Sequence, residues 1–110
     1  MKKVLLLSVL MALTTLFVNA DPAKKVTLTY KSGKLLIIAD HPVKDVNSHY
    51  IDLITITIDG KDVKEIKLTK QSSNLAETLE VDLPGIKPGS TIQVKTRCNQ
   101  FGNKSAKLKV

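Results

Sequence analysis

The sequence ITITIDG at residues 54–60 decides the fold class of this chain. Isoleucine alternates with threonine over residues 54–58, so the apolar side chains of an extended strand would share one face and the polar ones the other. Asp59-Gly60 follows at once, and this dipeptide favours the left-handed backbone conformations of a two-residue hairpin turn. The segment therefore predicts a half-buried strand that folds back on itself as an antiparallel hairpin.

Similar alternating segments lie on both sides of this hairpin. We expect strands at residues 26–30, 35–39, 51–58, 63–69, 75–83, 91–97 and 104–110. Turn-forming residues such as Pro84-Gly85 and Pro88-Gly89 separate some of them. Residues 71–77 could form a helical turn, which is too short to change the class. Short strands at roughly eight- to twelve-residue intervals predict an all-β fold, a seven-stranded immunoglobulin-like β-sandwich or barrel.

The first twenty residues are predicted to be a secretory signal peptide. Lys2 and Lys3 precede an apolar run at residues 4–18, and Val18 and Ala20 are the small residues that a signal peptidase accepts. The run is shorter than the roughly 20 residues of a membrane span. We therefore expect cleavage after Ala20, export to the periplasm or the cell exterior, and one mature domain at residues 21–110 that has no membrane attachment.

The charge of the chain is basic but dispersed. Removing Lys2 and Lys3 lowers the formal net charge from +7 to +5, and the remaining lysines are spread singly along the sequence. Only 4% of the residues are aromatic, whereas single-stranded nucleic acids are bound by basic grooves with aromatic stacking platforms. We expect a solvated surface and no nucleic-acid partner, although dispersed positive charge can attract a small anion.

The side chains most able to bind a metal or to react are the only two histidines and the only cysteine of this sequence. His41, His49 and Cys98 all fall at the ends of predicted strands, where a rigid scaffold commonly presents binding residues. Imidazole nitrogen and thiolate sulfur are ligands for iron, copper and zinc. A single cysteine in a secreted chain can also be a buried thiol, a reactive group or a link to another copy in a homo-oligomer.

Five short motifs follow one another between Lys34 and Gly102. They are His41-Pro42, His49-Tyr50-Ile51, Asp59-Gly60-Lys61, Lys87-Pro88-Gly89 and Cys98-Asn99-Gln100-Phe101-Gly102. In this order and spacing the chain resembles the iron-binding domain of superoxide reductases, the family that includes desulfoferrodoxin and neelaredoxin.

This resemblance implies an immunoglobulin-like β-barrel that holds one non-haem Fe(II) with four histidines and an axial cysteine. Superoxide would be reduced to peroxide at the open sixth position, with electrons from a separate donor. By resemblance, His41 and His49 would be two planar ligands and Cys98 the axial one. One family histidine falls on Phe101, and the upstream segment that carries the other histidine and a catalytic lysine has no counterpart here.

Three classes of function remain open from the residues. The first is a superoxide reductase-like oxidoreductase with a reduced iron shell, in which Lys44 could attract superoxide. The second is a non-catalytic metal-binding module, because a set of two histidines and one cysteine also suits copper or zinc. The third is an interaction module without metal. Tyr50 and Phe101 are expected to pack in the core or line a pocket.

Overall fold

The computed structural model describes residues 22–110, so the predicted signal peptide lies outside the described residues. This part of the chain contains seven β-strands and no helix. The strands are β1 (Lys25–Lys31), β2 (Lys34–Asp40), β3 (Ile51–Ile58), β4 (Lys61–Lys67), β5 (Ala76–Asp82), β6 (Thr91–Cys98) and β7 (Asn103–Lys109). Each predicted strand is present, but the helical turn considered for residues 71–77 is not formed, because residues 72–75 are bends and β5 begins at Ala76. Among residues 22–110 there is accordingly no helix that could cross a membrane.

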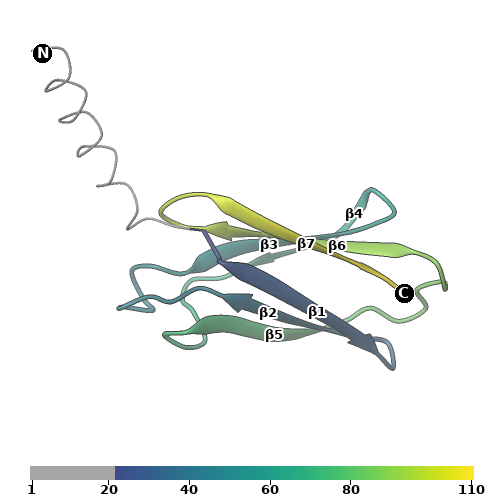
Figure 1. The fold of residues 1–110 in the computed structure, drawn as a ribbon, viewed down its shortest axis with the longest axis horizontal. Coiled ribbons are helices and arrows are strands. Elements are labelled where there is room, and N and C mark those ends of the chain that lie inside the picture. The colour runs from purple at the N-terminus through teal and green to yellow at the C-terminus, as the bar shows by residue number, and fades with distance from the viewer. Residues whose placement is uncertain (1–21) are drawn as a thin grey trace, which may run out of the picture.

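The strands form two antiparallel sheets that face each other (Figure 1). One sheet has the order β1-β2-β5 and the other the order β4-β3-β6-β7. Strands β1 and β7 lie close together, yet they belong to different sheets and are not hydrogen-bonded as neighbours. The fold is therefore sandwich-like, and the closed barrel that we also considered is not formed.

Two tight turns have left-handed backbones at both central residues, and the one at Asp59-Gly60 is the hairpin turn that its sequence predicts. Asp59 and Gly60 have φ angles of 50° and 85°, so both central residues of the β3–β4 hairpin are left-handed. Ser32 and Gly33 do the same between β1 and β2, with φ angles of 53° and 76°. Left-handed central residues match the twist of a two-residue hairpin, which explains the tight connections.

The core lies between the inner faces of the two sheets. From the three-stranded sheet, Leu35, Ile37 and Ala39 of β2 are fully buried. From the four-stranded sheet, the fully buried apolar residues are Ile51, Ile54, Ile56, Ile92 and Val94. The alternation predicted around residues 54–58 thus points its isoleucines inward at Ile54 and Ile56, whereas Ile58 at the strand end is only partly buried. Burial of these side chains is the main force that holds the sheets together.

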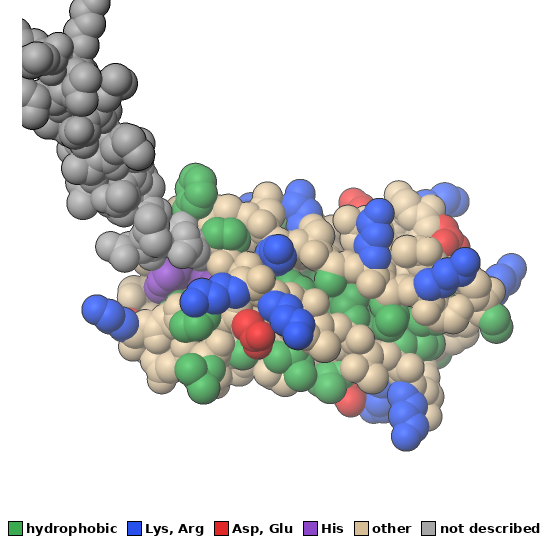
Figure 2. Space-filling view, viewed as in Figure 1, with side chains coloured by type: hydrophobic (Ala, Val, Ile, Leu, Met, Phe, Trp, Pro, Cys, Tyr) green, Lys and Arg blue, Asp and Glu red, His purple; other side chains and the backbone are tan. Residues whose placement is uncertain are grey.

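Lysines are spaced apart over the visible surface (Figure 2). Several lie on the outermost strands of the sheets, including Lys61 and Lys64 on β4 and Lys107 and Lys109 on β7. Charged side chains on edge strands oppose pairing with another chain, so edge protection accounts for part of the basic charge.

We expect Ile56→Val to lower the free energy of unfolding by about 0.5–1.5 kcal/mol, because it deletes one methylene from a fully buried site. Urea denaturation of the metal-free protein measures the change. The matched control is Val63→Ala on β4, where the side chain is 48% exposed and a change within about 0.5 kcal/mol is expected. Equal losses in the two variants would contradict the assignment of the core.

Candidate metal centre

The structure brings His41, His49 and Cys98 together at one end of the sandwich. One ligand atom from each residue lies within 4.8 Å of the others. His41 and Cys98 are 2% and 4% exposed, and His49 is partly buried with its Nε2 atom inside. Ligand atoms around a bound zinc ion lie about 3.3–3.8 Å apart, given metal–ligand bonds of about 2.0–2.3 Å. A contraction of about 1 Å at the widest pair would therefore bring the three to coordinating distance.

The strand pattern explains why His41 and Cys98 face inward. On β2 the buried positions are Leu35, Ile37 and Ala39, and His41 continues this period-two series just beyond the strand end. On β6 the buried positions end with Thr96 and Cys98. A backbone hydrogen bond of 2.9 Å from His41 N to Leu75 O extends the β2–β5 pairing to the histidine. The two candidate ligands are thus a polar extension of the core, one from each sheet.

His49 is placed by the start of β3 and by a turn that precedes it. Ile51 pairs with Cys98 in the β3–β6 ladder, so the residues just before β3 lie beside the end of β6. The carbonyl of Asp45 accepts hydrogen bonds from Ser48 N and His49 N at 3.2 and 3.0 Å. The Asp45 side chain accepts another from Asn47 N at 2.9 Å, a local bond typical of aspartate in turns. The turn therefore brings His49 back toward Cys98.

Asn99 ties the Cys98 loop to the residues on both sides of His49. Its Oδ1 accepts a hydrogen bond from Tyr50 N at 2.9 Å, and its Nδ2 donates to Ser48 O at 3.0 Å. Its own backbone N–H donates to Tyr50 O at 3.0 Å. The side chain of Gln100 adds a bond of 3.2 Å to Ser48 O. One asparagine thus fixes the separation of two of the three candidate ligands.

Gln71 fixes the ring of His41. Its Nε2 donates to His41 O at 2.7 Å and to Ser73 O at 2.9 Å, so its Oε1 is directed at the histidine ring. Oε1 lies 2.7 Å from His41 Nδ1 and can only accept, so Nδ1 carries the proton. The unprotonated ring nitrogen is then Nε2, the atom that would bind a metal. Metal-binding histidines characteristically donate their other N–H to such an outer partner.

The sulfur of Cys98 also has a hydrogen-bond donor in its loop. The backbone N–H of Gln100 donates to Sγ at 3.4 Å, and Cys98 N donates to Gly102 O at 3.0 Å. The sulfur therefore has an outer hydrogen-bond partner, as the side chains that bind metals commonly do. The rings of His41 and His49 meet edge to face, with centroids 4.8 Å apart and planes at 88°.

A pocket of about 650 Å³ borders the cluster at His49. Lys44, Asp45 and Gln100 are among the residues that line it. The end of the molecule that carries the cluster is on the left of Figure 2, where a histidine side chain reaches the surface. A small molecule in this pocket would therefore contact one of the three candidate ligands and one lysine.

Arg97 and Asp52 form an ion pair on the outer face of the four-stranded sheet, at the end that carries the candidate ligands. Arg97 Nε and Nη2 donate to the two carboxylate oxygens of Asp52 at 2.9 and 3.0 Å. These hydrogen bonds, together with the negative charge of Asp52, raise the pKa of Arg97 above its ordinary value. Asp52 adjoins Ile51 and Arg97 adjoins Cys98, so the pair bridges β3 and β6 next to the candidate ligands.

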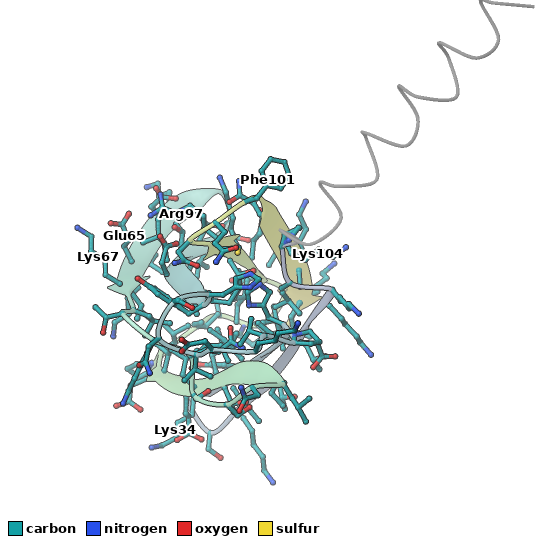
Figure 3. All side chains as sticks on the ribbon, turned by 90° about the vertical axis from the view of Figure 1, so that its left-hand side faces the viewer. Lys34, Glu65, Lys67, Arg97, Phe101 and Lys104 are labelled. Atoms are coloured by element: carbon teal, nitrogen blue, oxygen red, sulfur yellow. The ribbon has the colours of Figure 1, made fainter. Side chains whose placement is uncertain are left out.

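Phe101 does not line the cluster. Its side chain is 65% exposed, and Figure 3 shows it projecting away from the body of the sandwich. The expectation that Phe101 packs in the core or a pocket wall is therefore wrong, because the 98–102 loop turns its tip outward. Tyr50 is partly buried. The position where the resemblance implies a further histidine thus supplies no ligand.

Comparison with known proteins does not assign a family or a function to this chain. No protein-family model matches the chain, and no curated protein matches it. What the molecule itself defines is a β-sandwich that gathers two imidazoles and one thiol at one end.

We expect Asn99→Ala to weaken metal binding by about 10-fold or more, within the range for loss of an outer partner of a metal ligand. The reason is that its side chain supplies two of the bonds that hold the His49 turn against the Cys98 loop. Isothermal titration of the metal-free protein with Co(II) measures the change. Lys61→Ala, on the far hairpin, is the control, and equal affinities of the two variants would contradict this role of Asn99.

Proposed function

We propose that this protein binds one metal ion through His41, His49 and Cys98. The observation that carries the proposal is the convergence of the three side chains within 4.8 Å, two from the connection between β2 and β3 and one from the end of β6. Imidazole and thiolate are strong ligands for transition metals. The Gln71 bond to His41 and the Gln100 N–H bond to sulfur support it further, because such outer partners orient and activate metal ligands.

The site is proposed to sit on an immunoglobulin-like sandwich in an exported protein. In immunoglobulin folds the first, second and fifth strands share one sheet, and the third, sixth and seventh share the other. The orders β1-β2-β5 and β3-β6-β7 follow this pattern, with β4 added beside β3. The apolar run at residues 4–18 supports export, because its length and basic start are typical of a secretory signal.

Superoxide reduction at iron is a second candidate. The order of the motifs around His41, His49 and Cys98 supports it, as does the pocket in which Lys44 lies beside His49. When bound, Fe(II) would supply the electron that reduces superoxide to peroxide. A separate electron donor would then return the iron to the Fe(II) state. The described residues do not reproduce the five-ligand iron shell, since the cluster contains three ligand-type residues and Phe101 has no ligand atom. We therefore derive no catalytic step through iron.

Anaerobic titration of the mature protein with Co(II), followed by visible absorption, tests the metal-binding proposal. Co(II) reports its ligands spectroscopically, and a bound thiolate adds a sulfur-to-metal charge-transfer band. We expect saturation at one Co(II) per chain with that band present. Absence of saturable binding, or binding without a sulfur band, would contradict a site built on Cys98.

A further inference from the structure

We infer that metal ions reach and leave the cluster of His41, His49 and Cys98 through the pocket beside His49, and that the charges of Lys44 and Asp45 set the rate. The inference rests on the proposed metal-binding function and concerns the kinetics of that site for any divalent ion. Three features carry it: the burial of the other two ligands, the place of the His49 ring, and two opposite charges in the wall of the pocket.

The pocket borders the cluster at one of its three side chains. His49 is among the residues that line it, whereas His41 and Cys98, which are 2% and 4% exposed, are not. A second pocket, of about 330 Å³, is lined by Gln71 but by none of the three. The pocket beside His49 has a volume of about 650 Å³. Since a water molecule occupies about 30 Å³ in the liquid, an ion fits there with its hydration shell.

The ring of His49 lies between this pocket and the buried part of the cluster. The residue is partly exposed and lines the pocket, while its Nε2 atom is buried inside. Its ring also meets the ring of His41 edge to face, with centroids 4.8 Å apart. An ion that moves from the pocket to the Cys98 sulfur therefore has to pass the His49 ring. Rotation of this side chain leaves intact the backbone bonds from Ser48 N and His49 N to Asp45 O, so the turn stays in place while the ring moves.

Lys44 and Asp45 place opposite charges in the wall of the same pocket. Both residues are exposed and line it. Fixed charges near an entrance change the rate at which a charged ligand arrives, and dissolved salt screens the effect. The carboxylate of Asp45 attracts an approaching divalent cation, and the ammonium group of Lys44 repels it. Each charge should therefore alter the association rate in its own direction.

The first test measures Co(II) association with the metal-free protein by stopped-flow absorption at low ionic strength. Lys44→Gln and Asp45→Asn each remove one charge and nearly keep the size of the side chain, and asparagine keeps the oxygen that accepts from Asn47 N. We expect association to become roughly 2- to 5-fold faster in Lys44→Gln and slower by a similar factor in Asp45→Asn, because one unit charge acts on a divalent ion across a few ångströms of water. Salt at about 1 M, which shortens the Debye length to about 3 Å, should remove both differences.

Lys61→Gln and Asp62→Asn are the matched controls. They make the same two changes of charge on exposed residues of β4, beside the β3–β4 hairpin. The length of β3, eight residues, separates them from the cluster, so their association rates should stay close to that of the wild type.

Ser48→Trp tests the pocket itself by narrowing it. Ser48 is exposed and lines the pocket, and the substitution keeps the backbone carbonyl that Asn99 and Gln100 hold. A narrower route slows arrival and departure by the same factor, so association and dissociation should both be slower while Kd stays the same. Transfer of Co(II) to an excess of chelator measures dissociation. Ser105→Trp, at an exposed site on β7, is the control for an added indole and should change neither rate.

Two results would overturn the route and leave the metal-binding proposal standing. One is equal association rates in Lys44→Gln, Asp45→Asn and their controls; the other is a folded Ser48→Trp variant whose association is as fast as that of the wild type. If Ser48→Trp does not fold, the charge variants decide alone. Absence of saturable Co(II) binding by the wild type would contradict both the route and the metal-binding proposal.

Discussion

Cys98→Ser is expected to abolish the stabilisation that a bound metal gives to this protein. A ligand that binds only the folded state stabilises it by about 2.7 kcal/mol when its free concentration is 100 times Kd. Serine keeps the size of the side chain but replaces the thiolate with a hydroxyl, a far weaker ligand for a soft ion. Thermal unfolding with and without added metal measures the effect. The wild type should unfold at a higher temperature with metal, and the variant should not respond.

The metal-free forms supply the control for this prediction. Gln100 N–H can still donate to the serine oxygen, so the metal-free variant should unfold within about 1 kcal/mol of the metal-free wild type. A variant that gains as much stability from metal as the wild type does would show that Cys98 is not a ligand. Cys98→Ala, which has neither sulfur nor hydroxyl, separates residual binding by serine from binding elsewhere.

Gln71→Leu is expected to reduce both metal affinity and stability. The amide of Gln71 is 2% exposed and satisfies His41 Nδ1, His41 O and Ser73 O at once. Leucine leaves these groups without their partner, at about 1–3 kcal/mol for each buried group that finds no substitute. The His41 ring also loses the bond that sets its tautomer, so metal affinity should fall by about 10- to 100-fold. Chemical denaturation and metal competition measure the two losses separately.

Comparison of Gln71→Glu with Gln71→Leu shows whether Gln71 orients the His41 ring or only stabilises the fold. Glutamate keeps an acceptor for the Nδ1 proton but cannot donate to the two carbonyl groups. A carboxylate that accepts from a metal-bound histidine also raises the basicity of the ligand. The Glu variant should therefore be less stable than the wild type but bind metal more tightly than Gln71→Leu. Parallel losses of affinity in the Glu and Leu variants would mean that Gln71 acts only through stability.

The strands were predictable from the sequence because their signals are local. Period-two alternation depends on neighbouring residues, and the hairpins at Asp59-Gly60 and Ser32-Gly33 are set by the residues of the turn itself. Alternation could not show that the sheets stay apart at β1 and β7, since that depends on how two distant strands meet. It also left residues 71–77 ambiguous, and there the backbone is held by contacts such as the bond from Gln71 N to Val46 O.

The three candidate ligands were predictable by residue type, but the residues that position them were not. His41 and Cys98 continue the inward-facing series of β2 and β6, a pattern that could have indicated their orientation from sequence. Gln71 lies thirty residues from His41 and in a segment without periodicity, so nothing local marks it. Asn99 adjoins Cys98 in the motif, yet its bonds to both neighbours of His49 depend on the β3–β6 register.

The most direct test of the central claim is the metal content of the protein and of a His41→Ala/His49→Ala/Cys98→Ala triple variant. Both would be loaded anaerobically with excess Cu(I), Zn(II) or Fe(II), desalted, and measured by elemental analysis against protein concentration. A site built on these side chains predicts close to one ion per wild-type chain for at least one metal, and none in the folded triple variant. A wild-type chain that retains no metal, or a triple variant that retains as much, would contradict it.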